Sequence, residues 1–153
     1  FLVMRKVIFM LVVTLAGIFA AFATDKNLTL DELFDKVSHI DRFEVMDFNG
    51  GDMGFPDNLG KGVLAIHPNA EPREEIVALL NQIPRESLVY DNTDEEGRFD
   101  RFFKEGDSTL LYVHVGHGSG DTAVILFKGG KAEDVNDFIS RINRELSELN
   151  SEE

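Results

Sequence analysis

The sequence predicts an α+β domain, a mixed and largely antiparallel sheet of five or six strands with three helices packed on it. Three segments, near residues 29–40, 71–84 and 132–149, carry apolar residues at helical spacing. Between them lie short runs rich in β-branched and aromatic residues, bounded by glycine-containing turns, which is typical of strands. The chain has no cysteine, so the domain depends on its hydrophobic core.

The first helix is predicted over residues 29–40. Thr29 and Glu32 have the spacing of a capping box at its start. The apolar stripe of this helix consists of Leu30, Leu33, Phe34, Val37 and Ile40. A short strand is predicted at 43–48, where apolar and charged residues alternate, and the glycine-rich segment 49–61 is predicted to be a loop.

The next segment is predicted to be a strand–helix–strand unit. Residues 62–67 form an apolar run that Pro68 ends, and Pro72 suits the first position of a helix over 71–84. A further short strand is predicted at 87–90. Because a helix joins the two strands, they are expected to lie parallel to each other.

The rest of the chain predicts a meander and a final helix. Residues 99–130 contain three apolar and aromatic runs separated by turns, as in antiparallel strands. Residues 132–149 carry the clearest helical stripe. This helix and the helix at 71–84 are expected on one side of the sheet, which leaves the first helix and the loop at 49–61 to cover the other.

Residues 1–23 have the pattern of a cleavable secretory signal peptide. Two basic residues precede an apolar run over 7–22, which ends in the small-residue pattern Ala-Phe-Ala. A retained membrane anchor needs about 20 apolar residues, and this run is shorter. Cleavage after Ala23 would leave residues 24–153 as a single exported domain, periplasmic or extracellular. Without cysteine for lipid modification, no stable membrane anchor is expected after cleavage.

The net charge excludes one class of partner. The chain carries 28 acidic and 15 basic residues, for a formal charge of -13. Binding to nucleic acid requires lysine and arginine to replace the counterions of the phosphate backbone, so nucleic acid is not expected as a partner. Anionic membrane surfaces are disfavoured for the same reason.

The segment HVGHGSGD, residues 114–121, is predicted to be a hairpin turn, because its glycines suit the positive φ angles that a chain reversal uses. If the loop spans 116–120, His114 pairs with Thr122 across the hairpin. His117 then lies at the tip of the turn.

The same segment holds the weak candidates for a metal site, His114, His117 and Asp121. Zinc needs three or four ligands at fixed distances, and a flexible glycine tip holds them poorly. A small metal-dependent envelope hydrolase using these three residues is therefore the alternative to a protein without catalytic activity. Otherwise no catalytic residue, metal or cofactor is predicted.

Two acidic loops leave calcium binding open. The loop at 91–97 aligns in part with an EF-hand loop, but Phe103 falls where the bidentate glutamate is required. The loop at 47–57 also carries several acidic residues and matches no known pattern of ligands.

The strands of the predicted hairpin at 110–126 are apolar on both faces. They are either central strands with two buried faces or strands with one face partly open, and an open apolar face marks an interaction surface. The residues assigned to that face are Leu110, Tyr112, Val124 and Leu126, edged by His114. Its occupant would be a protein partner or a second copy of the chain.

The order of elements, the signal and the closing segment FKGGKAEDVNDFISRI together resemble small exported proteins of unknown function found in Bacteroidetes. The resemblance covers most of residues 24–153 and implies placement in the cell envelope. Members are often lipid-anchored, whereas this chain lacks the anchoring cysteine. The expected function is that of an exported binding or interaction module of the bacterial cell envelope.

Overall fold

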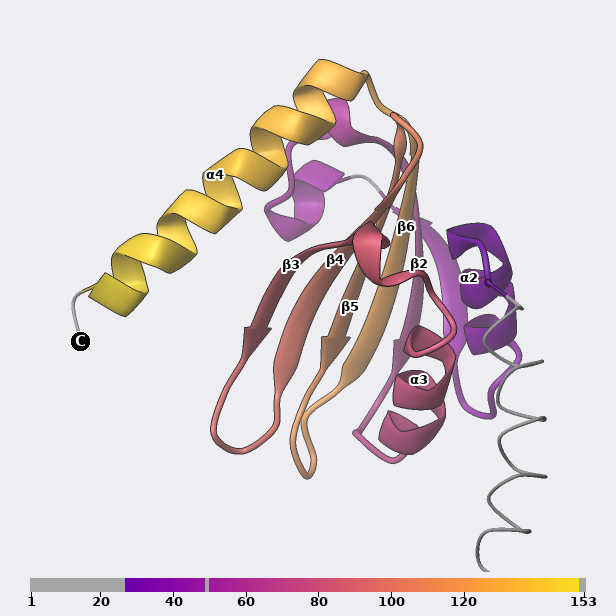
Figure 1. Cartoon of the computed structure of the whole chain (residues 1–153). Helices are drawn as coiled ribbons and strands as arrows, with labels where there is room; N and C mark the ends of the chain where they lie inside the picture. Colours follow the sequence, from indigo (N-terminus) through magenta and orange to yellow (C-terminus); the bar gives the residue numbers. More distant parts are fainter. Residues whose placement is uncertain (1–26, 49, 152–153) are drawn as a thin grey trace, which may run out of the picture.

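The computed structural model describes residues 27–48 and 50–151, which form one antiparallel sheet with helices on both faces (Figure 1). The predicted signal peptide, residues 1–23, lies outside this range. The strands are β1 (Glu44–Phe48), β2 (Gly60–His67), β3 (Leu88–Thr93), β4 (Phe99–Glu105), β5 (Thr109–Val115) and β6 (Thr122–Gly129). The helices are α2 (Leu30–Ser38), α3 (Arg73–Leu80) and α4 (Ala132–Ser151), with 3-10 turns η1 (Gly50–Met53), η2 (Asp57–Leu59) and η3 (Arg85–Ser87). The predicted α+β class is confirmed.

The strand order is β1-β2-β6-β5-β4-β3, and every neighbouring pair is antiparallel. The parallel pair predicted from the strand–helix–strand unit is therefore not formed. β2 pairs with β1 on one side and with β6 on the other, so β2 has no free edge for β3. The chain instead passes through α3 and η3 and adds β3 at the opposite edge of the sheet, next to β4.

The helices divide between the two faces of the sheet (Figure 1). α2 and α3 pack on one face, here called the α2 face, where Leu33 and Ile76 share one core cluster. α4 packs on the other, here called the α4 face, where Val135 and Phe138 join a second cluster with Leu59 of η2. The expectation that α3 and α4 share a side was wrong, because each turns its apolar stripe to a different face.

The first helix begins as its sequence predicts. The Thr29 side chain accepts a hydrogen bond of 3.1 Å from the backbone N–H of Glu32, which is the capping interaction expected from their spacing. Leu30 and Val37 on the predicted stripe are completely buried. Local capping and amphipathic spacing therefore agree with the tertiary packing of α2.

The two-sided apolar strands are central strands with two buried faces. Residues 122–127 of β6 are all buried, and successive side chains alternate between the α2 face and the α4 face. Leu110, Val124 and Leu126 of the expected partner surface are at most 5% exposed. The apolar residues of that surface are thus core residues in this chain, apart from the half-buried Tyr112.

The residues assigned to the partner surface also do not share one face. Val115, not His114, pairs with Thr122, and His114 pairs with Ala123. The pairing is shifted by one residue from the prediction, because the backbone N–H of Gly116 donates to the carbonyl of Asp121 and only residues 117–120 lie between them. A shift of one residue moves side chains to the opposite face. Tyr112 and His114 consequently face α4, whereas Val124 and Leu126 belong to the α2 face.

The segment 50–59 reaches the α4 face through a glycine with special geometry. Gly60 has φ 100° and ψ -166°, a region open essentially to glycine alone. A Cβ atom at this position would overlap the backbone carbonyl oxygen of Lys128. The backbone therefore passes close to β6, and the Phe55 ring lies 5.3 Å from the ring of Phe127 in β6, measured between centroids.

α4 covers its face with its first half. Val135 and Phe138 are buried, whereas Leu149 near the end of the helix is 61% exposed. Figure 1 shows the helix running obliquely away from the end of β6 toward β3, at the edge of the sheet. None of the helices within the described residues is long and apolar enough to span a membrane.

Candidate functional site

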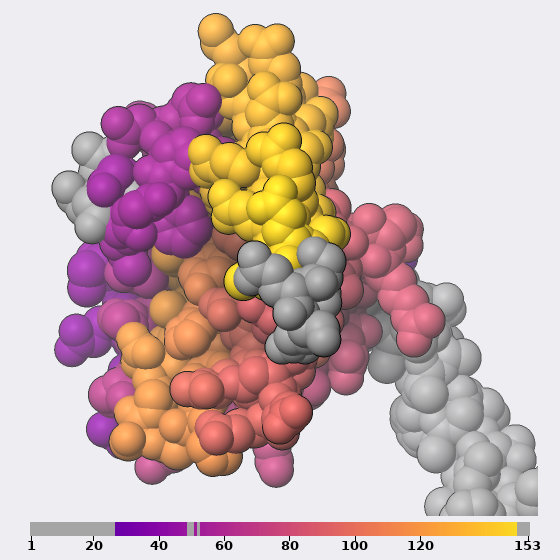
Figure 2. Space-filling model, turned by 90° about the vertical axis from the view of Figure 1, so that its left-hand side faces the viewer, coloured from indigo at the N-terminus to yellow at the C-terminus, as the bar shows by residue number. Residues whose placement is uncertain are grey.

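An open cleft of about 460 Å³ lies between α4 and the α4 face of the sheet. Figure 2 views this side of the molecule, with α4 in yellow above and the strand region in salmon and orange below. The cleft is lined by Gly54, Phe55, Tyr90, Asp100, Phe102, Tyr112, Phe138, Arg141, Ile142 and Glu145. It combines aromatic rings with a small number of charged groups, as ligand sites do.

The aromatic floor of the cleft follows from the register of three strands. Tyr90 pairs with Phe102 across β3 and β4, and Phe102 pairs with Tyr112 across β4 and β5. Directly paired residues of antiparallel strands point to the same face, so the three rings form a row. Their centroids are 5.7 Å apart for Tyr90 and Phe102, and 4.8 Å apart for Phe102 and Tyr112.

The wall of the cleft comes from outside the sheet. Phe55 of the 50–59 segment lies 5.4 Å from the Tyr112 ring and 6.4 Å from the Phe138 ring of α4, measured between centroids. On α4, the Arg141 guanidinium lies over the Phe138 ring, 5.4 Å from its centroid. The helix is tied to the edge strand by a hydrogen bond of 2.9 Å from the Asn143 side chain to the Val89 carbonyl.

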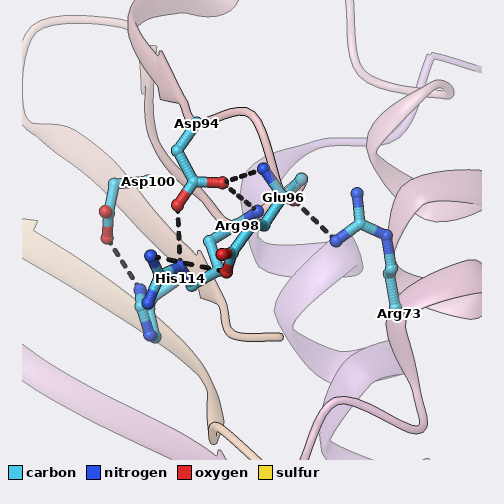
Figure 3. A network of polar contacts seen from close by, with 7 residues as sticks. Arg73, Asp94, Glu96, Arg98, Asp100 and His114 are labelled. Carbon is cyan, nitrogen blue, oxygen red and sulfur yellow. Dashed lines mark hydrogen bonds and ion pairs between the residues drawn. The ribbon is translucent and has the colours of Figure 1, made fainter. Parts of the chain in front are cut away.

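A polar cluster lies beside the aromatic row, two residues along the strands on the same face. Asp100 of β4 is paired with His114 of β5, and the His114 Nδ1 lies 2.9 Å from the Asp100 Oδ1. The Tyr112 hydroxyl donates to the same carboxylate oxygen. On its other side, the His114 Nε2 lies 3.7 Å from the Asp121 carboxylate. Figure 3 shows the His114–Asp100 contact beside the turn that carries Asp94.

These contacts shift the ionisation of all three groups. Burial alone would raise the pKa of Asp100, but hydrogen bonds from His114 and Tyr112 outweigh it and lower the pKa below its ordinary value. The bond to Asp100 raises the pKa of His114, although burial opposes it. Burial and the same carboxylate raise the pKa of Tyr112 well above its ordinary range. Tyr112 therefore remains a protonated donor, and Asp100 remains an ionised acceptor.

The segment HVGHGSGD is a turn, as predicted. Its closing backbone bond, from the Gly116 N–H to the Asp121 carbonyl, is 2.9 Å long. Gly118 at its tip has φ 61°, a positive angle of the kind the turn was expected to need.

His114, His117 and Asp121 do not come together as a ligand set. Asp121 approaches His114, but His117 is exposed at the tip of the turn and lines a separate shallow hollow beside Glu71 and Glu96. Across residues 27–48 and 50–151, no three histidine, aspartate or glutamate side chains are grouped so that they could hold a metal ion.

The acidic turn at 91–97 uses its central carboxylate internally. Asp94 accepts hydrogen bonds from the backbone N–H groups of Glu96 and Arg98, each 2.9 Å long, and from the Arg98 side chain at 2.7 Å (Figure 3). Arg98 and these bonds lower the pKa of Asp94. This carboxylate stabilises the turn, as short acidic side chains often do.

Comparison of the chain with protein-family models, with curated proteins and with solved structures found no match. The site must therefore be interpreted from its own geometry and chemistry.

The sequence predicts only some of the residues of this site. Tyr112 and His114 belong to the partner surface that the sequence predicts. Tyr112 lines the cleft, and His114 contacts the Asp100 carboxylate, which also lines it. The sequence does not single out Asp100, Arg141 and Glu145, because acidic and basic residues are common in this chain. The one available signal is Asp100, a charged residue two places before Phe102 on the inward side of a strand.

Proposed function

We propose that this protein is a binding module without catalytic activity and that the cleft between α4 and the sheet receives its ligand. The observation that carries the proposal is the aromatic floor, because Tyr90 and Tyr112 border an open space instead of being fully covered by α4. A ligand in this space would bury apolar ring surface and gain polar contacts from Asp100, Arg141 and Glu145.

The geometry gives less support to the alternative, a metal-dependent hydrolase. His117 lies apart from His114 and Asp121, so the three residues offer no joint coordination site. In the cleft, Tyr112 donates to Asp100 and has a raised pKa, which makes its hydroxyl a poor nucleophile. Binding requires no such activated group.

We also propose that the protein acts outside the cytoplasm, in the bacterial cell envelope. The support is the signal-peptide pattern of residues 1–23, together with the resemblance to small exported proteins. Mass spectrometry of the full chain after expression in a bacterial host tests this proposal. A mature protein that begins at Thr24 and is recovered from the periplasm is expected, and a protein retained in the cytoplasm with residues 1–23 attached would contradict it.

The cleft can be tested with an introduced fluorophore, because the chain contains no tryptophan. Tyr90→Trp places the reporter at the floor of the cleft, and Leu149→Trp places it on the exposed end of α4, outside the lining. Each variant is titrated with benzyltrimethylammonium, benzyl alcohol and benzoate, which share an aromatic ring and differ in charge.

Binding in the cleft predicts a saturable change in the emission of Tyr90→Trp with at least one of these probes. Leu149→Trp should show no saturable change with the same probe. If no probe gives saturation in either variant, or if both variants respond alike, the proposed ligand site is wrong.

A further inference from the structure

The aromatic rings of the cleft meet at steep angles. The Phe55 ring is inclined by 62° to Tyr112 and by 61° to Phe138, and the Tyr90 ring is inclined by 72° to Phe102. Phe102 and Tyr112 are inclined to each other by only 33°, so the rings form a box with a nearly flat floor at this pair and with Phe55 as one wall. The face of each ring carries partial negative charge, so a box of this kind attracts a cation held inside it.

The charged side chains around the box also favour a cation. Among the described residues, the carboxylates of Asp100 on the floor and Glu145 on α4 line the cleft with a single cationic side chain, Arg141. Both carboxylates act on Tyr90, whose pKa is raised first by burial and further by these two negative charges. The whole chain carries a charge of -13, which adds to the negative potential at the site.

Arg141 shows how a cation is accommodated here. Its guanidinium lies over the Phe138 ring, at 5.4 Å from the centroid. The same side chain also lines a neighbouring hollow, together with Asp134 and Asp137. That hollow is also lined by Arg144, so Arg141 lies at the border of the two spaces. The cation–π contact of Arg141 is with Phe138, and the rings of Phe55, Tyr90 and Tyr112 are the ones we assign to the ligand.

From these observations we infer that the ligand of the cleft is a small organic cation with an alkylated ammonium group, held between the rings of Phe55, Tyr90 and Tyr112 and the carboxylates of Asp100 and Glu145. The inference rests on the proposed binding function and adds the ligand class to it. An anionic ligand would be repelled by the two carboxylates. A purely apolar ligand would remove the Glu145 carboxylate from water without offering it a partner, which costs free energy, whereas Asp100 already accepts from His114 and Tyr112.

Choline and its uncharged isostere 3,3-dimethylbutan-1-ol test the inference, because they have nearly the same shape and differ in the charge of one atom. Binding to the otherwise unmodified chain is measured by NMR chemical-shift titration of backbone amides in the cleft. Choline is expected to bind about fivefold more tightly than the isostere, or better, since only the charged ligand gains cation–π contacts with the rings.

Two variants locate the effect. Glu145→Gln removes a carboxylate of the cleft, whereas Glu133→Gln makes the same change at an exposed position of α4 outside the lining. Glu145→Gln should weaken choline binding by at least about threefold and leave the isostere unchanged. Glu133→Gln should alter neither. Equal weakening by both variants would show a general charge effect and would overturn the inference.

The outcomes also separate this inference from the proposed function. If the isostere or a neutral or anionic ring compound binds in the cleft as tightly as choline, the ligand class is wrong and the binding module stands. If nothing binds, both fail. A blocked Gly-Lys-Gly peptide serves as the second source of an ammonium group, and tighter binding of this peptide than of choline would overturn the assignment to a small molecule.

Discussion

At the scale of single residues, the site depends on which neighbours each polar group meets. Asp100 would be costly inside an aromatic row if it stood alone, because a buried carboxylate loses its hydration. His114 and Tyr112 both bond to it, so the charge is compensated where the strands place it. The cluster is at once a stable part of the fold and the charged end of the cleft.

The ionisation of His114 predicts a pH-dependent stability. Its pKa is raised in the folded protein by Asp100, so the pair stabilises the fold fully below the ordinary histidine value of about 6.5 and loses this contribution as pH rises through the raised value. The stability of the wild type minus that of His114→Asn should therefore be largest at about pH 6 and shrink toward about pH 8, as measured by urea unfolding.

The control for this experiment is His117→Asn, which changes an exposed histidine at the tip of the same turn. Asp121 and Arg98 also act on His114, one raising and the other lowering its pKa, and both are retained in the two variants. A stability difference for His114→Asn that stays constant over this pH range would contradict the proposed role of the ion pair.

Gly60 predicts a second effect at the residue scale. Gly60→Ala should lower the free energy of unfolding by more than the roughly 1 to 3 kcal/mol that an unfavourable backbone conformation costs, because the new Cβ would also overlap the Lys128 carbonyl. Gly118→Ala is the matched control, since Gly118 also has positive φ but a Cβ added there would meet no atom within 4 Å. Equal losses in urea unfolding of the two variants would exclude the overlap.

At the scale of elements, α4 decides whether a cleft exists. Its first half is anchored by Val135 and Phe138, while its second half leans over the edge strand and leaves the tyrosines of the floor partly open. An amphipathic helix that lay flat along the sheet would cover these rings. The oblique path of one helix thus leaves part of an aromatic face open as a cleft.

The oblique position of α4 predicts that substitutions at its two ends change the stability of the protein by different amounts. Phe138→Ala should reduce stability by about 3 to 5 kcal/mol, because it removes a ring buried between Phe55 and Phe102. Leu149→Ala should change it by less than about 0.5 kcal/mol, because that side chain is largely exposed. Urea unfolding of both variants measures the difference, and similar losses would show that the end of α4 is docked more tightly than described.

At the scale of the whole molecule, charge sets the conditions for stability and for binding. An excess of 13 negative charges repels itself in the compact state and attracts cationic ligands. For the cation that we propose as the ligand, this field would add to the attraction of Asp100 and Glu145. Salt screens both effects, because exposed charges interact over about 10 Å at 0.1 M ionic strength.

The charge excess predicts that salt stabilises the protein. The midpoint of thermal unfolding at pH 7 should rise by about 3 °C or more between about 20 mM and 300 mM NaCl, as self-repulsion is screened. Near the isoelectric point the same salt series should have little effect, since the net charge is then small. A midpoint that falls with salt at pH 7 would mean that attractive ion pairs outweigh the repulsion.

The sequence by itself determined the class of the fold and the start of its first helix, because these depend on local spacing. Thr29 and Glu32 are three residues apart in the sequence in any conformation. The helical spacing of the apolar residues along α2 requires only that one surface of the protein cover them. The turn at HVGHGSGD was likewise predicted, since its glycines suit positive φ wherever the strands lie. The pairing of the strands across it was predicted one residue out of register, and this placed Val124 and Leu126 on the wrong face.

Only the tertiary structure decided the order of the strands, the side on which each helix packs and the existence of the cleft. β2 takes β6 rather than β3 as its neighbour, although β3, β4 and β5 all lie between them in the sequence, because pairing depends on which edges remain free once the sheet assembles. The cleft joins Phe55, Asp100 and Glu145 from three distant segments. The local sequence of each segment does not determine the distances between these three residues, whereas the packing of α4 across the sheet does.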